Sequence, residues 1–190
     1  MAKINYPGAA AIVAICSLLC SSANAADLLK SGPSVFNYNF AEVLYLDDDN
    51  ADGFGLRFSA DVRENFALQF EYARVSDGGF DADTLIGGLT YHIETAKFPG
   101  QADWVFDAGL EFVDANGIDD TGIFLGAGIR YALNDQTELN GKLGLATVFD
   151  TDIFLNLRAL YEVSTGFSVF LETDLGSRSD LGLGVRFYWR

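Results

Sequence analysis

From Val35 to the end of the chain, apolar and polar residues alternate in short runs that are separated by turn residues. In the run 53–62, for example, Phe, Leu, Ala and Val at even positions alternate with Gly, Arg, Ser and Asp at odd positions. Alternation with a period of two is typical of a β-strand whose two faces meet different surroundings. The runs are 35–46, 53–62, 66–75, 84–93, 104–113, 121–132, 137–148, 153–163, 167–175 and 181–190. The pattern predicts an all-β fold with ten strands, or eight if one weak hairpin is dropped.

The polar face of these runs carries charges of both signs, interspersed with glycines. The charged positions are Arg57, Asp61, Glu71, Asp107, Glu111, Arg130, Glu138, Lys142, Arg158, Glu162, Glu172 and Arg186. In a membrane barrel such a face would fill the lumen, where opposite charges can pair, and the apolar face would meet lipid. Large apolar residues on the polar face, at Phe124, Phe154, Leu160 and Phe170, indicate that the lumen is occluded.

The first run has one exception to this division. Its face with Phe36, Tyr38, Phe40, Leu44 and Leu46 is predicted to be the apolar, lipid-facing one, although Glu42 interrupts it.

Aromatic residues fall at one end of nearly every run. They are Phe36, Phe66, Tyr91, Trp104, Tyr131, Tyr161, Phe167 and Trp189. Aromatic rings partition to the headgroup level of a bilayer, so this arrangement predicts a girdle at one interface. A sheet in hydrocarbon must also close on itself, because each unpaired backbone group there costs several kcal/mol. The predicted fold is therefore a closed, antiparallel, up-and-down transmembrane β-barrel over residues 35–190, with both termini in the periplasm. The alternative is a secreted lipocalin-like carrier with its apolar face inside.

Residues 1–25 are predicted to be a signal peptide rather than part of the fold. Lys3 precedes an apolar run from Ala9 to Cys20, and Ala23–Ala25 forms an A-x-A cleavage site. Cleavage after Ala25 would remove both cysteines, and residues 26–34 would form a short tail before the barrel. Lipidation of Cys20 is an alternative, although Leu19 stands where lipoprotein processing prefers a small residue. Export and a membrane barrel together predict the outer membrane of a Gram-negative cell.

The chain is strongly acidic, with 12 basic and 27 acidic residues and a net charge of −15. Loss of Lys3 leaves 11 basic residues, so the net charge becomes −16. This balance excludes nucleic acid as a partner, because that role needs a basic surface. Much of the acid lies in odd-numbered connections that are predicted to be loops at one rim. These connections are 47–52, 76–83, 114–120, 149–152 and 176–180. We expect this rim to meet lipopolysaccharide and to bind divalent cations weakly.

Few residues suggest a specific site. Asp48, Asn50 and Asp52 match the opening of a calcium loop, but its twelfth position would be Ser59 instead of glutamate. These three residues are a weak metal candidate. The single histidine, His92, is predicted to make a hydrogen bond in the lumen. No nucleophile is accompanied by a recognisable base, so we predict no enzymatic activity, no catalytic residues and no cofactor.

The closing segment Leu181–Arg190 reads Leu-Gly-Leu-Gly-Val-Arg-Phe-Tyr-Trp-Arg. With the alternation described above, it resembles the small outer-membrane β-barrel proteins related to the OmpA transmembrane domain. The resemblance implies that the barrel-assembly machinery recognises the C-terminal strand Leu181–Trp189 and that the barrel contacts outer-membrane lipid. The predicted role is structural or surface-interacting, with a lumen filled by charged pairs. A narrow porin-like channel for small solutes is the alternative.

Overall fold

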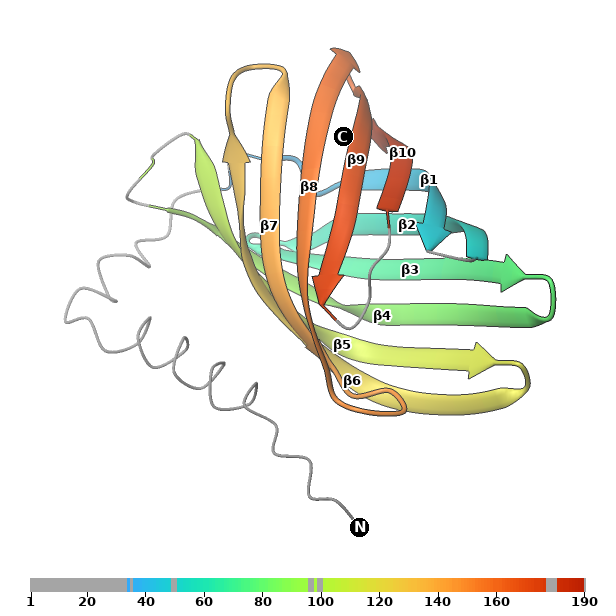
Figure 1. Ribbon diagram of the computed structural model, residues 1–190. Helices are drawn as coiled ribbons and strands as arrows, with labels where there is room; N and C mark the ends of the chain where they lie inside the picture. Colours follow the sequence, from blue (N-terminus) through green and yellow to red (C-terminus); the bar gives the residue numbers. More distant parts are fainter. Residues whose placement is uncertain are drawn as a thin grey trace.

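The protein is an all-antiparallel β-barrel of ten strands (Figure 1). The structure is a computed structural model, and it describes residues 34, 36–48, 51–95, 98, 101–176 and 181–189. The strands are β1 (Phe40–Asp48), β2 (Ala51–Arg63), β3 (Phe66–Asp77), β4 (Phe80–Glu94), β5 (Ala102–Ala115), β6 (Ile118–Ala132), β7 (Thr137–Ala146), β8 (Asp152–Ser164), β9 (Phe167–Gly176) and β10 (Leu181–Tyr188). The predicted fold class and the count of ten strands are confirmed. The predicted signal peptide, residues 1–25, lies outside the described residues, as does all of the tail except Ser34.

The sheet closes through its first and last strands. β1 pairs with β10 in a continuous ladder from Phe40 opposite Tyr188 to Asp47 opposite Leu181. The two strands lie side by side in Figure 1, and each of the other strands pairs with its neighbours in sequence. Closure leaves the start of β1 and the end of β10 at the same end of the barrel, which we call the terminal end. No helix in the described ranges is long and apolar enough to cross a bilayer.

The hairpins β3–β4 and β5–β6 are longer than the sequence pattern predicted. β4, β5 and β6 have 15, 14 and 15 residues, whereas β1 and β10 have 9 and 8. The prediction of loops at 76–83 and 114–120 is wrong. The flanking strands continue into both ranges, and each hairpin closes with a turn of two residues. Asn116 and Gly117 form one of these turns with φ values of 54° and 78°. Positive φ at both turn residues matches the twist of a hairpin, and Asn-Gly is the preferred sequence for it.

Large apolar side chains point outward from every strand. One exposed example from each strand, in order, is Val43, Leu56, Leu68, Leu89, Leu110, Ile123, Leu139, Leu157, Leu171 and Leu183. The charged face points into the barrel, where Glu42, Glu172 and Arg186 are at most 4% exposed. This sidedness is the reverse of what a carrier with an apolar interior needs.

β1 begins at Phe40, so the predicted start near Val35 is wrong, and so is the lipid-facing side assigned to Phe40, Leu44 and Leu46. Both leucines point inward and are 2% and 7% exposed, whereas Tyr45 is 51% exposed. The reason is register. Glu42 pairs with arginines on both neighbouring strands, and residues two and four positions further along must share its face.

Several inward glycines make room for these large side chains. A Cβ atom at Gly144 would collide with the ring of Phe154, and one at Gly184 would lie 2.5 Å from Cζ of Phe170. These inward glycines therefore act as gaps that allow phenylalanine rings to pack across the narrow interior.

Aromatic rings gather around the outside of the terminal end. Tyr91 lies 5.0 Å from Phe66 and 6.4 Å from Phe106 between ring centroids, and Phe167 lies 5.0 Å from Phe187. Phe66 and Phe167 are the first residues of β3 and β9, and Phe187 is near the end of β10. The rings are therefore at the same level of the barrel, as the predicted interfacial girdle requires. The place predicted for Phe36 in this girdle is wrong, because its ring lies against the guanidinium of Arg130, which is 7% exposed.

Candidate functional site

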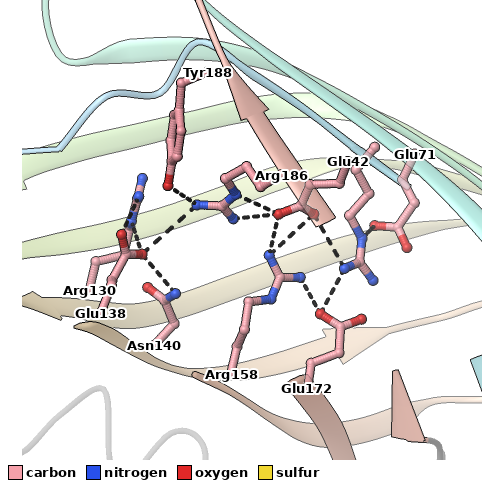
Figure 2. A network of polar contacts seen from close by, with 10 residues as sticks. Glu42, Glu71, Arg130, Glu138, Asn140, Arg158, Glu172, Arg186 and Tyr188 are labelled. Atoms are coloured by element: carbon pink, nitrogen blue, oxygen red, sulfur yellow. Dashed lines mark hydrogen bonds and ion pairs between the residues drawn. The ribbon is translucent and has the colours of Figure 1, made fainter. Parts of the chain in front are cut away.

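The centre of the lumen is occupied by a network of ion pairs built around Glu42 of β1. Glu42 is 1% exposed and accepts a hydrogen bond of 2.6 Å from Nε of Arg186 and one of 3.1 Å from Nη1 of Arg158. Nη1 of Arg57 lies 3.6 Å from the same carboxylate. Figure 2 shows Arg186 and Arg158 converging on Glu42. The β-ladders bring Arg57 and Arg186 there, because both are directly opposite Glu42 in register.

A second acidic centre, Glu172 of β9, links two of these arginines. Arg57 donates to it from Nη1 over 2.7 Å, and Arg158 forms an ion pair with the same oxygen. Nε of Arg57 also lies 2.9 Å from Glu71. Arg57 and Arg158 therefore each bridge Glu42 and Glu172, so that side chains from distant strands are tied together across the lumen.

The third part of the network lies towards the terminal end. Arg130 donates two hydrogen bonds to Glu138, of 2.8 and 2.9 Å. Asn140 donates to the same glutamate over 2.8 Å, and Nη1 of Arg186 lies 3.9 Å from it. Arg186 therefore joins the Arg130–Glu138 pair to the Glu42 centre (Figure 2).

We call these eight side chains the lumen network: Arg57, Arg130, Arg158, Arg186, Glu42, Glu71, Glu138 and Glu172. Its four positive and four negative charges balance, and eight of the ten strands contribute one residue each. Charges withdrawn from water are costly unless they are paired and hydrogen-bonded, so balance and close contact are what make this interior tolerable. The sequence predicted that seven of these eight charges face inward, but it placed Glu42 on the lipid-facing side and did not specify which charges pair.

The opposite wall carries a smaller pair. Asp107 of β5 is 6% exposed, accepts a 2.7 Å hydrogen bond from Thr90 and lies 3.1 Å from Nζ of Lys142. Between this wall and the lumen network lies a cavity of about 200 Å³. Within the described part of the chain, Nε2 of Gln69 and Oδ1 of Asp174 make no hydrogen bond, and both residues line it. A cavity of this size, with polar groups in part of its wall, has room for several water molecules at about 30 Å³ each.

The large apolar residues expected in the lumen are there. Phe124, Leu160 and Phe170 are 6%, 3% and 2% exposed, and Phe154 lines the cavity. They narrow the space that the lumen network leaves.

His92 lies near the terminal end and makes the predicted polar contact, with Nε2 3.3 Å from Oδ1 of Asp61. The ring of Tyr38 stacks on the imidazole at 3.7 Å between centroids. Tyr38 is 3% exposed, and burial raises the pKa of its phenol above the usual range, so it remains a donor to Asp103. The sequence pattern placed Tyr38 on the lipid face, and only the tertiary structure reveals this role.

The weak metal candidate is only partly described. Asp52 accepts a 2.5 Å hydrogen bond from the hydroxyl of Tyr45. Asp48 pairs with Ala51 through its backbone, but its side chain and all of Asn50 lie outside the described residues. The candidate stays a prediction. Among the residues that the structure describes, no group of three or more His, Cys, Asp or Glu side chains is arranged to hold a metal ion.

Comparison with known proteins gives a likeness of fold. No protein-family profile and no curated protein sequence matches the chain. Among solved structures, the KdgM porin in complex with disordered oligogalacturonate is similar with a TM-score of 0.52 and 11% identity, over 80% of this chain and 99% of that one. The N-terminal β-barrel domain of Pseudomonas aeruginosa OprF has a TM-score of 0.45 and 16% identity, over 81% of this chain and 100% of that one. Neisserial surface protein A has a TM-score of 0.42 and 18% identity, over 83% and 99%. The likeness to the KdgM porin, with a TM-score above 0.5, shows that the barrel has a fold found among outer-membrane β-barrel proteins.

Proposed function

We propose that the protein is an integral barrel of a Gram-negative outer membrane, with a structural or surface-interacting role and a lumen closed by ion pairs. The observation that carries the proposal is the sidedness of the wall. Every strand points apolar side chains outward, and eight strands point a paired charge inward. In water such an outer surface would be a large exposed apolar patch, whereas in a bilayer it meets hydrocarbon.

The ends of the barrel fit the same location. The proposal puts the terminal end, with its aromatic rings, at the periplasmic interface and the acidic rim outside, where lipopolysaccharide and its divalent cations would meet it. Cleavage after Ala25 and recognition of Leu181–Trp189 by the barrel-assembly machinery are parts of this proposal. Outward Leu183 and Phe187, 59% and 49% exposed, give that strand the apolar face such a signal needs.

The lumen network supports closure rather than catalysis. Each of its glutamates lies within salt-bridge distance of an arginine, so the carboxylates act as partners of fixed charges. A general acid or base needs instead to reach a reacting group. We therefore assign the lumen a structural role and no enzymatic one.

A narrow channel for small solutes is the second candidate. The cavity of about 200 Å³ favours it, because polar groups line a space inside the wall. Passage would require the bridges from Arg57 and Arg158 to open.

Two experiments test the proposal. The exported protein should fractionate with outer membranes, require detergent for extraction, and migrate differently on gels before and after boiling. Recovery as a monodisperse protein in plain buffer would refute the membrane assignment. In planar bilayers the closed-lumen proposal predicts no steady conductance, whereas steady unitary channels from the unmodified protein would favour the second candidate.

A further inference from the structure

The described residues that precede β1, 34 and 36–39, do not extend the barrel wall. β1 begins at Phe40, yet Tyr38, two residues earlier, is 3% exposed and contacts residues of β4, β5 and β6. In the ring of ten strands, β6 is five positions from β1 in either direction. The chain therefore crosses the mouth of the lumen at the terminal end. We call the described residues of this segment, Ser34 and Phe36–Asn39, the N-terminal strap.

Tyr38 is held on the far side of the mouth by three different contacts. Its ring stacks on His92 with an interplanar angle of 11°, and its hydroxyl donates to Oδ2 of Asp103 over 3.2 Å. The guanidinium carbon of Arg130 lies 4.4 Å from the ring centroid. A ring placed between an imidazole and a guanidinium gains both stacking and cation–π attraction.

Other strap residues are anchored on both sides of the mouth. On the far side, Arg130 also lies 4.5 Å from the ring of Phe36, and Ser34 donates a hydrogen bond to Asp103. On the near side, the side-chain amide of Asn37 donates to the carbonyl of Trp189 over 3.0 Å. The strap is thus attached at two opposite points of the rim.

These contacts are largely made by side chains, whereas the wall is held by backbone ladders. The backbone of the strap does join the wall at Asn39, whose carbonyl accepts a 3.2 Å hydrogen bond from the amide of Trp189. Beyond that point the strap can leave the mouth without breaking a pair of the β1–β10 ladder, which starts at Phe40. Tyr38 also lines the lumen cavity, so its departure would connect the cavity to the terminal end.

We propose that the N-terminal strap is a closure of the lumen mouth at the terminal end, separate from the lumen network. The strap seals the cavity from that side, and its displacement gives water and small solutes access to the residues behind it. In the membrane setting of the proposed function, on which this orientation rests, the strap closes the periplasmic mouth.

The test measures access to a thiol behind the strap. Ser59 is 4% exposed and lines the cavity, and it lies opposite Phe40 in register. A Ser59→Cys variant of the full chain, with Cys16 and Cys20 replaced by serine, would carry one thiol. The reaction of this thiol with a cationic methanethiosulfonate reagent is followed in detergent micelles. Micelles make the result independent of where the barrel resides in the cell.

The strap is displaced by the double change Phe36→Ala and Tyr38→Ala. The matched control is Phe66→Ala with Tyr91→Ala, which removes the same two residue types from the outside of the same end. We expect the strap variant to raise the labelling rate by at least about tenfold and the control to change it by less than about twofold, because thiol reactivity follows access.

Equal labelling rates in the parent and the strap variant would overturn the proposal, and so would an equal rise in the control. Boiling-dependent gel migration reports whether each variant is folded. If the double variant does not fold, Tyr38→Leu alone provides the same comparison, because it removes the stacking and the hydrogen bond to Asp103. A labelling rate for Tyr38→Leu equal to that of the parent would again contradict the strap as a closure.

Discussion

Replacing Glu42 by glutamine removes one negative charge from a network in which four arginines face four glutamates. The change keeps the size of the side chain and some of its hydrogen-bonding capacity. It leaves a net charge of +1 in an interior where Glu42 is 1% exposed and Arg186 is 2% exposed. The structure therefore predicts a large loss of stability from a nearly isosteric change.

The magnitude follows from what each arginine retains. Arg57 and Arg158 keep Glu172 as a partner, so neither is stranded. Among the described residues, Arg186 keeps weaker contacts, with Oε1 of Glu138 at 3.9 Å, the hydroxyl of Tyr188 at 3.2 Å and the ring centroid of Phe40 at 4.0 Å from its guanidinium carbon. One buried pair is thus broken, which costs about 3–5 kcal/mol of unfolding free energy.

The assay is equilibrium unfolding by urea of the protein folded in lipid vesicles, followed by tryptophan fluorescence and by gel migration. Glu64→Gln, on the exposed turn between β2 and β3, is the matched control and should change stability by less than about 0.5 kcal/mol. The double variant Glu42→Gln with Arg186→Gln restores neutrality, so its loss should be smaller than the sum of the single losses by about 1–3 kcal/mol. A loss for Glu42→Gln no larger than that of the control would refute the reasoning.

Three further predictions use the same unfolding measurement. Leu110→Arg places a charge midway along the outer face of β5 and should cost about 2–4 kcal/mol in a bilayer, against about 0–1 kcal/mol for Ile118→Arg at the rim; equal costs would contradict a hydrocarbon belt. Gly184→Ala puts a Cβ 2.5 Å from Cζ of Phe170 and should cost about 1–3 kcal/mol by overpacking, whereas an unchanged unfolding midpoint would show that the interior is loosely filled. Asn116→Val puts a β-branched residue at a φ of 54° and should cost about 1–3 kcal/mol, while Asn116→Gly should not; indistinguishable variants would contradict the turn geometry.

The period of two in the sequence was enough to predict the ten strands, the closed antiparallel barrel and the inner face of most strands. It misassigned β1, because Leu44 and Leu46 are apolar residues on the inner face and Glu42 alone signalled the true side. Alternation is a property of one strand, whereas the face of Glu42 is fixed by its opposite residues on two other strands. If the first and last runs of the sequence are aligned as neighbouring antiparallel strands, Glu42 lies opposite Arg186, which points to the inner face for Glu42.

The pairs of the lumen network and the N-terminal strap depend on contacts between residues far apart in the chain. Arg158 and Glu42 are separated by 116 positions, and no local pattern specifies which inward glutamate an inward arginine meets. Tyr38 continues the alternation of β1 and was therefore assigned to the same wall. Its place in the mouth follows from His92, Asp103 and Arg130 on three other strands. The Asn-Gly pair at 116–117, in contrast, was a local signal for a tight hairpin that the expectation of an acidic loop obscured.

The most direct measurement is the environment of a nitroxide spin label on the two faces of the wall, in vesicles. One label replaces Leu110, 61% exposed on the outer face, and the other replaces Asn156, which lines the cavity. At position 110 we expect oxygen, which dissolves in hydrocarbon, to relax the spin label more strongly than a water-soluble nickel complex does. At position 156 we expect no such preference for oxygen. A label at position 110 that the nickel complex relaxes more strongly than oxygen would contradict the account.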